Sequence, residues 1–196
     1  AKGFIGSHLL KLFPDADTLD WKDGQDIRTF EPTKDYTHIF HLAALRSAPL
    51  GEVMPEEFIS TNCWGTVRLL KLFPNARFLN VTSASAENVK GVYGATKKFA
   101  ELVGSLNKNV VNIRPHNVFG EEQGTDSGAV IPLFIKAYLT GTKPTVYGNG
   151  LQKRDFTYVG DLVIEMKNIM LDDDFHPLMG MPHHCGYAKA ITILEL

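Results

Sequence analysis

Apolar residues along this chain fall into two kinds of segment: short runs that suit buried strands, and longer stretches with helical spacing. The short runs predict strands near Thr18 and at residues 37–44, 78–81 and 110–113. The periodic stretches predict helices after Gly6 and at residues 55–73, 93–106 and 159–170. Strands that alternate with helices in this way predict an α/β fold built on a doubly wound parallel sheet.

The alternation loosens after Pro115, where Gly, Pro and Thr become more frequent. We therefore expect a main domain made of residues 1–115 and about 158–172. Residues 116–157 and about 173–196 are expected to form a smaller substrate-binding region. The chain opens on a glycine-containing turn, so we expect the main domain to lack its first strand. Because the sequence stops at Leu196, we also expect the smaller region to be truncated.

Composition narrows the class of function. The 196 residues are 44% hydrophobic and 21% charged, which is ordinary for a globular protein. The net charge of −2 gives no basic surface for nucleic acid, and no apolar stretch approaches the roughly 20 residues that span a bilayer. Cys63 and Cys185 are too few for a disulfide scaffold, so we expect a cytoplasmic protein without nucleic-acid or membrane partners.

Tyr93 and Lys97 lie four residues apart at the start of a predicted helix and would share one face of it. A phenol titrates near pH 10, and an ammonium one turn away would favour the phenolate and lower that pKa. The pair would then be able to transfer a proton at neutral pH. The same spacing also occurs on solvated helices, so further motifs are needed to decide.

A glycine-rich turn at the start of the chain enters a helix. Gly3 would let the backbone approach a pyrophosphate, and Gly6 would let helix and strand pack closely. The amides of Phe4 and Ile5 would face the phosphates at the positive end of the helix dipole. The usual fingerprint has an earlier glycine and a preceding strand, so a plain glycine-containing turn is the alternative.

The segment from Asp17 to Asp20 would form a short strand that ends in an acid. The Asp20 carboxylate suits the ribose hydroxyls of NAD and would repel the additional phosphate of NADP. Lys22 lies close enough to soften that repulsion, and a turn aspartate is the alternative. NAD is therefore expected in preference to NADP.

Motifs spread in order through the whole chain resemble the extended short-chain dehydrogenase/reductases, and among them the NAD-dependent epimerase/dehydratase family that acts on nucleotide sugars. The matching segments are residues 3–8 (GFIGSH), 26–28 (DIR), 41–44 (HLAA), 62–66 (NCWGT), 81–85 (VTSAS), 93–97 (YGATK), 114–120 (RPHNVFG), 147–150 (YGNG) and 154–161 (RDFTYVGD). The resemblance implies that the main domain is a Rossmann-type NAD-binding domain.

The resemblance also implies a catalytic set of Ser83, Tyr93 and Lys97. Ser83 would hydrogen-bond the sugar oxygen and Tyr93 would remove its proton while hydride leaves the adjacent carbon. Lys97 would bind the nicotinamide ribose and, together with the positive nicotinamide ring, would hold the Tyr93 pKa down. Thr82 and Ser85 are alternative hydroxyls one or two residues away from Ser83.

Further positions are implied for the two ligands. Asn62 matches an asparagine that supports the surroundings of the catalytic lysine, and Arg154 matches an arginine whose fork suits a diphosphate. Tyr147 has a core aromatic as its alternative. The implied cofactor-binding residues are Gly3, Phe4, Ile5, Gly6, Asp20, Asp26, Ile27, Leu42, Ala43, Ala44, Asn62, Tyr93 and Lys97. The implied substrate-binding residues are Ser83, Asn117, Val130, Thr145, Tyr147 and Arg154.

Departures from the family pattern narrow the reaction. Ala84 and Ser85 stand where dehydratases carry Asp-Glu, which argues against a 4,6-dehydratase. The Cys and His of the fucose-type epimerase-reductases are not in place either. Ser83 and Tyr93 are ten residues apart, closer than is usual in extended members. Residues 43–49 faintly resemble a loop of epimerases that act on N-acetylated or uronic UDP-sugars.

We therefore expect an NAD-dependent nucleotide-sugar 4-epimerase that works through a 4-keto intermediate. A nucleotide-sugar reductase or dehydrogenase of the same family and a non-catalytic nucleotide-binding member are the alternatives. The family also implies a homodimer formed by a four-helix bundle of helices 55–73 and 93–106. No metal site is expected, because adjacent residues in the run from His183 to Cys185 point to opposite sides of an extended segment. His41 is expected to be a hydrogen-bonded core histidine.

Overall fold

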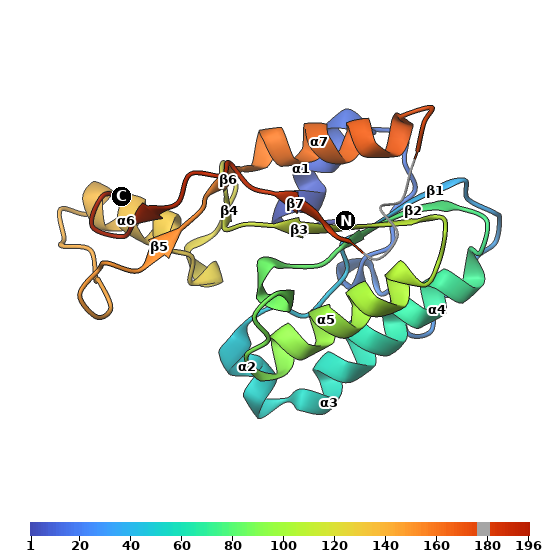
Figure 1. The fold of residues 1–196 in the computed structure, drawn as a ribbon, viewed down its shortest axis with the longest axis horizontal. Coiled ribbons are helices and arrows are strands. Elements are labelled where there is room, and N and C mark those ends of the chain that lie inside the picture. Colours follow the sequence, from blue (N-terminus) through green and yellow to red (C-terminus); the bar gives the residue numbers. More distant parts are fainter. Residues whose placement is uncertain (176–180) are drawn as a thin grey trace.

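The computed structural model describes residues 1–175 and 181–196. At its centre lies a four-stranded sheet in which all neighbouring strands are parallel (Figure 1). In their order across the sheet, the strands are β1 (His38–His41), β2 (Arg77–Val81), β3 (Val110–Pro115) and β7 (His183–Cys185). The expected Rossmann-type parallel sheet is therefore confirmed.

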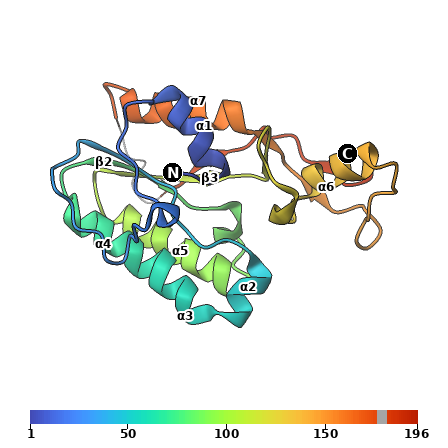
Figure 2. The same ribbon diagram turned by 180° about the vertical axis from the view of Figure 1, so that it is seen from behind.

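Helices cover both faces of this sheet (Figures 1 and 2). On one face, α1 (Phe4–Leu12) packs beside α7 (Val159–Leu171). On the other face lie α4 (Gly65–Leu72) and α5 (Gly91–Ser105). Within the described residues, no helix has both the length and the apolar character needed to cross a bilayer.

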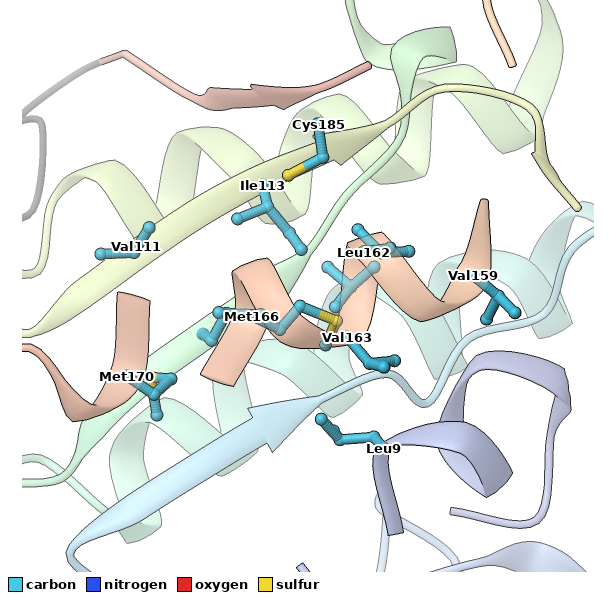
Figure 3. Close-up of a cluster of buried hydrophobic side chains, with 11 residues drawn as sticks. Leu9, Val111, Ile113, Val159, Leu162, Val163, Met166, Met170 and Cys185 are labelled. Atoms are coloured by element: carbon cyan, nitrogen blue, oxygen red, sulfur yellow. The ribbon is translucent and has the colours of Figure 1, made fainter. Parts of the chain in front are cut away.

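Two hydrophobic clusters, one on each face, hold the sheet and helices together. Phe78 and Leu79 are neighbours on β2 and point to opposite faces, where both are almost completely buried. Burial on both faces explains why this strand is a continuous apolar run in the sequence. The cluster under α1 and α7 consists of Leu9, Leu79, Val81, Val111, Ile113, Val159, Leu162, Val163, Met166, Met170 and Cys185 (Figure 3).

The helix predicted over residues 55–73 is a continuous helical run in three parts. These are α3 (Pro55–Phe58), the π-helical segment η2 (Ile59–Trp64) and α4. A short helix that the pattern did not predict, α2 (Ala48–Val53), precedes them. The helix expected after Gly6 begins earlier, at Phe4, so that Gly3 is its N-terminal capping residue.

A smaller lobe projects from one end of the sheet (Figure 1). It contains α6 (Val130–Leu139) and the short helices and strand pairs that surround it. β4 (Val118–Phe119) pairs with β6 (Thr157–Tyr158) in parallel, and β5 (Lys153–Arg154) pairs with β8 (Ile191–Thr192) in antiparallel fashion. A single turn of 3-10 helix, η4 (Thr125–Ser127), precedes α6 in this lobe. Two others, η1 (Trp21–Asp23) and η3 (Ala84–Ala86), lie in the part of the molecule that contains the sheet. The division into two domains remains a prediction, and residues 176–180 of the predicted smaller region lie outside the described residues.

The prediction of a strand near Thr18 is wrong. Asp20 has extended backbone angles, but no strand among the described residues pairs with residues 17–20. A groove of about 760 Å³ lies between this segment and the side of β1 that faces away from β2, and it is lined by side chains such as Phe13, Ile39 and Phe73. Without hydrogen bonds to a neighbour, an extended segment is not part of a sheet.

His41 lies at the buried end of β1, as expected for a core histidine. Its Nε2 is 2.9 Å from the Thr66 hydroxyl oxygen, and that hydroxyl donates to the Asn62 carbonyl oxygen. The Thr66 proton is thus already used, so His41 donates to Thr66 from a neutral ring. Burial, helped by the charge of Lys97, lowers the pKa of His41 to about 3.

His41 should make the fold sensitive to acid. Because its folded pKa lies below the ordinary value of 6.5, the unfolded chain binds a proton that the folded chain does not between about pH 6.5 and pH 3. Stability should therefore fall by up to about 1.4 kcal/mol per pH unit as pH drops through this window. We expect His41→Leu to flatten the pH dependence of urea unfolding there; parallel curves for the two proteins would contradict this assignment.

Candidate active site

The candidate active site lies where parallel strands end and loops begin. β1 is followed by Leu42, Ala43 and Ala44, β2 is followed by Thr82 and Ser83, and β3 is followed by His116. The carboxyl ends of parallel strands share one edge of a sheet, where α/β proteins bind their ligands. Predicted cofactor-binding and catalytic residues from separate parts of the sequence are therefore placed at one edge.

Tyr93 is held at the first turn of α5 by contacts from α2 and α3. The Glu52 side chain on α2 accepts a hydrogen bond of 2.8 Å from the Val92 amide, close to the helix N-terminus. Gly91 has φ +67°, a conformation that favours glycine. The Tyr93 ring packs edge-on against Phe58, with ring centroids 6.5 Å apart. Glu52 had no role in the sequence-based expectation.

Ser83 is the hydroxyl that the geometry favours among the three candidates. The Thr82 side chain is buried and donates to the Ile113 carbonyl oxygen at 2.8 Å. Ser85 is exposed, whereas the Ser83 hydroxyl is close enough to Tyr93 to act on the pKa of the phenol. Ser83 also accepts a hydrogen bond of 3.1 Å from the Ser85 amide, which orients its side chain.

Lys97 is buried on the same face of α5 as Tyr93, one turn further along. Its ammonium donates to the Val81 carbonyl oxygen at 2.9 Å, at the end of β2. Burial lowers the pKa of Lys97 to about 8. The hydrogen bond thus holds the lysine at the sheet edge. Because its pKa is about 8, both the charged and the neutral form are populated near physiological pH.

The expectation that Lys97 lowers the Tyr93 pKa is not met in the chain by itself. Burial raises the pKa of Tyr93, against the opposing effects of the Ser83 hydroxyl and the Arg46 charge. The ammonium of Lys97 is directed to the Val81 carbonyl, and the cation that acts on the phenol is Arg46. Spacing along a helix cannot show where a long side chain ends.

Asn62 braces the site from within the π-helical segment η2. Its side-chain oxygen accepts from the Leu45 amide at 2.8 Å, and its nitrogen donates to the Leu45 carbonyl and to the Thr96 hydroxyl. Both amide protons are used and the residue is 2% exposed. These contacts join the loop after β1 to Thr96, the residue before Lys97, and agree with the supporting role that the sequence predicts for Asn62.

The N-terminal turn has the features of an anion-binding helix end. α1 has no side-chain cap, and its first internal hydrogen bond runs from the Ser7 amide to the Gly3 carbonyl at 2.9 Å. The amides of Phe4, Ile5 and Gly6 therefore have no partner within the helix. A Cβ built on Gly3 meets no atom within 4 Å, whereas one on Gly6 would collide with the Ala1 backbone. This turn fits the pyrophosphate of a dinucleotide.

Alanine substitutions at Gly3 and Gly6 should have different effects on stability and on NAD binding. Gly3→Ala places a methyl group in open space, so unfolding should be unchanged while NAD affinity falls by about tenfold or more, because the methyl obstructs the pyrophosphate. Gly6→Ala should lower both stability and affinity, because its methyl meets the Ala1 backbone. Urea unfolding and NAD titration by calorimetry measure the two effects. Unchanged NAD affinity in Gly3→Ala would contradict the assignment.

Asp20 and Asp26 are both tied down by neighbouring donors. Burial acts to raise the pKa of Asp20, whereas hydrogen bonds from the Lys22 and Lys2 amides act to lower it. Asp26 accepts from the Arg28 amide and guanidinium. The Ile27 side chain is buried in the cluster with α4. Asp20 is thus an anion at neutral pH beside the glycine turn.

Apart from Ser83, the predicted substrate-binding residues are spread over the smaller lobe. Asn117 is exposed, has φ +31° and donates from its side chain to the Asp155 carbonyl at 2.8 Å. Val130 begins α6, and Thr145 and Tyr147 lie in the loop that follows α6. Tyr147 is 80% exposed, which rules out a core aromatic. Arg154 is exposed on β5.

The run from His183 to Cys185 forms β7, and its three side chains have separate neighbours. His183 lies 2.8 Å from the Glu165 carboxylate, while His184 contacts Arg114 and His116. Cys185 is buried in the cluster with α7, where burial raises its pKa to about 12. Among the described residues no group of three potential ligands is arranged to hold a metal ion.

The sequence of this chain is similar to those of known proteins. The model of the NAD dependent epimerase/dehydratase family matches residues 1–174. UDP-glucuronic acid decarboxylase 2 of Arabidopsis thaliana is 27% identical over 242 residues, covering 99% of this chain and 53% of that protein. The probable polysaccharide biosynthesis protein EpsC of Bacillus subtilis is 34% identical over 154 residues, covering 74% of this chain and 24% of EpsC. The chain spans about half the length, or less, of these relatives.

Solved structures share the fold. A UDP-N-acetylglucosamine 4-epimerase from Methanobrevibacter ruminantium M1, in complex with UDP-N-acetylmuramic acid, is 26% identical with a TM-score of 0.80. The alignment covers 98% of this chain and 76% of that one. The UDP-glucose 4-epimerase of Thermotoga maritima, at 21% identity over 98% of this chain and 76% of that chain, has a TM-score of 0.79. At that identity the second likeness concerns the fold alone.

Proposed function

Because this chain belongs to the NAD dependent epimerase/dehydratase family, we propose that it is a nucleotide-sugar epimerase that acts at C4 through a 4-keto intermediate. NAD dependence, which we expected, is a property of the family. The observation that carries the proposal is the pairing at Tyr93. A hydroxyl from Ser83 and a positive charge from Arg46 both act on the same phenol, at the ligand-binding edge of the sheet.

The proposed chemistry divides simply between cofactor and protein. NAD, when bound, supplies the capacity to accept a hydride from the sugar carbon and to return it. Ser83 hydrogen-bonds the reacting oxygen of the sugar, and Tyr93 takes the proton of that oxygen and later gives it back. In the chain alone, burial raises the pKa of Tyr93 against the opposing effects of the Ser83 hydroxyl and the Arg46 charge. Arg46 would act together with the positive charge of the nicotinamide ring of bound NAD to favour the phenolate that takes the proton. The amides at the start of α1 hold the pyrophosphate.

Asp20 supports the preference for NAD over NADP in this proposal. The Lys2 and Lys22 amides donate hydrogen bonds to its carboxylate and favour the charged form at neutral pH. A fixed negative charge close to the ribose would repel the additional phosphate of NADP. Lys22 donates its backbone amide to this carboxylate, while its side chain lies on the exposed side of η1.

A second candidate reaction is suggested by the relatives. UDP-glucuronic acid decarboxylases are among the curated proteins that match this chain. A reductase or dehydrogenase of the same family is the other enzymatic alternative. The non-catalytic alternative is disfavoured, because Ser83, Tyr93 and Lys97 are all present and Ser83 lies beside Tyr93.

Product analysis separates these reactions. We would purify the chain, determine whether NAD is retained, and incubate it with UDP-glucose, UDP-N-acetylglucosamine and UDP-glucuronic acid. Retained NAD and formation of the C4 epimer are expected. Release of carbon dioxide would indicate the decarboxylase, and a requirement for added reduced cofactor would indicate the reductase. Binding of NAD and nucleotide sugar with no product would support the non-catalytic reading.

We further propose a cytoplasmic homodimer, built from the predicted helices 55–73 and 93–106. Large apolar side chains are exposed on these helices, among them Trp64 at 64%, Leu102 at 55% and Leu106 at 88%. Pairing with a second copy would remove them from water, and exposed apolar surface of this kind marks interaction sites.

Leu102→Lys should convert the dimer to a monomer, because a charge would be buried at the centre of the paired helices. Light scattering of the purified protein measures the change. Leu139→Lys on α6, where the leucine is 76% exposed outside these helices, is the matched control and should leave the mass unchanged. A wild-type chain with the mass of a monomer would refute the dimer.

A further inference from the structure

A chain of polar contacts runs from the buried side of α5 to the end of β3. Glu101 on α5 is 2% exposed and holds Arg114 of β3 through two hydrogen bonds of 2.7 Å. Arg114 extends to His184 on β7, with 3.4 Å between Nη1 and Nε2. His184 Nδ1 in turn lies 3.1 Å from Nε2 of His116. None of these four residues has a part in the proton transfer at Tyr93.

The orientation of Arg114 determines which ring nitrogens of His184 and His116 carry a proton. An arginine can only donate, so Nε2 of His184 is an acceptor and carries no proton. A neutral His184 must then carry its proton on Nδ1, from which it donates to Nε2 of His116. Nε2 of His116 is thus an acceptor as well, and the His116 proton is on Nδ1. The orientation of Arg114 is itself fixed by the bidentate carboxylate of Glu101.

The position of His116 gives that proton a use. His116 follows β3 directly, at the edge of the sheet where Ser83 follows the adjacent strand β2. The ladder between these strands continues to a hydrogen bond of 2.8 Å from the Thr82 amide to the Ile113 carbonyl, so Ser83 and His116 leave the sheet close together. The next residue, Asn117, has φ +31°, and strained backbone of this kind gathers at binding sites. Among the described residues, Nδ1 of His116 makes no hydrogen bond.

We propose that His116 is a substrate-binding residue, whose Nδ1–H donates a hydrogen bond to an oxygen of the nucleotide sugar. Arg114 and His184 are positioning residues that fix the tautomer of His116. The inference rests on the proposed function, since it supplies a further contact for the same substrate. The acceptor is either a phosphate oxygen or a hydroxyl of the sugar, which offer the same chemistry to an N–H donor.

The tautomer is tested by nitrogen-15 NMR of the chain labelled at histidine. We expect His116 to carry its proton on Nδ1 in the wild type, and to populate the Nε2–H form in His184→Phe, which keeps a ring but removes both nitrogens. A wild-type His116 protonated on Nε2 would overturn the proposal. This readout needs neither cofactor nor turnover, so it stays informative if the chain is not an epimerase.

The contact is tested by calorimetric titration of the NAD-loaded chain with UDP and with UDP-glucose. His116→Phe should weaken binding by about five- to tenfold, as expected for one hydrogen bond, while NAD affinity is unchanged. Weaker binding of both probes places the acceptor on a phosphate, and weaker binding of UDP-glucose alone places it on the sugar. His38→Phe, at the far end of β1, is the control. Equal affinities for wild type and His116→Phe would overturn the contact, and a wild type that binds neither probe would overturn the proposed function with it.

Discussion

Tyr93→Phe should lower the epimerisation rate by about 10³-fold, because general acid–base catalysis contributes on the order of 10²- to 10⁴-fold. The substitution removes only the phenolic oxygen and leaves the ring packed against Phe58. The urea midpoint should therefore stay close to that of the wild type. The rate is measured by following the C4 epimer of the sugar nucleotide that the wild type converts.

Two matched variants make this result specific. Tyr138→Phe on α6 removes the same oxygen from a side chain that is 84% exposed, and should leave the rate unchanged. Ser83→Ala should also slow the reaction and should raise the Tyr93 pKa further, because the Ser83 hydroxyl acts to lower it. Equal rates for wild type and Tyr93→Phe would remove the phenol from the mechanism.

Lys97→Met should lower activity by about 10²-fold and at the same time make the chain more stable at pH 7. Burial lowers the Lys97 pKa from 10.5 to about 8, so below about pH 8 the folded chain holds a buried charge that is more favourable in water. That difference corresponds to up to about 3 kcal/mol. Methionine of similar length removes the charge, and loss of activity with gain of stability is typical of functional sites.

The stability of the wild type should depend on pH through the titration of Lys97. Between about pH 8 and 10.5 the unfolded chain retains a proton on Lys97 that the folded chain has lost, so wild-type stability should rise with pH in this window. Lys97→Met should lack this rise, and the two proteins should approach equal stability above the window. Urea unfolding at several pH values measures it, with the exposed Lys71→Met as control. If the unfolding free energies of the wild type and Lys97→Met changed in parallel with pH, the lowered pKa of a buried Lys97 would be contradicted.

Local sequence patterns predicted the helices and strands that carry the site. The apolar run at residues 78–81 and the periodic stretch from Tyr93 correspond to β2 and α5, because burial of these elements on the sheet imposes their patterns. The segment at Asp17–Asp20 has a strand-like composition and yet forms no strand. Pairing depends on a neighbour in space, and composition does not report whether one is present.

Side-chain placement in the site was predicted less completely than the backbone. The family resemblance favoured Ser83 over Thr82, and the structure adds a physical reason, because the Thr82 hydroxyl is bonded to the Ile113 carbonyl. Arg46 and Glu52 act on the first turn of α5 from about forty residues away in the sequence, and no spacing rule connects them to Tyr93. Spacing alone predicted that Lys97 would lower the Tyr93 pKa. In the structure the Lys97 ammonium is bonded to the Val81 carbonyl, and burial of the phenol raises the Tyr93 pKa.

The most direct measurement uses a UDP-sugar that carries deuterium at C4, converted by the wild-type chain in ordinary water. If the hydride leaves and returns within one closed site beside Tyr93, the epimer should retain its deuterium at C4, and Tyr93→Phe should form almost none of it. Loss of the label to solvent, or absence of any epimer while NAD and nucleotide sugar are bound, would contradict this.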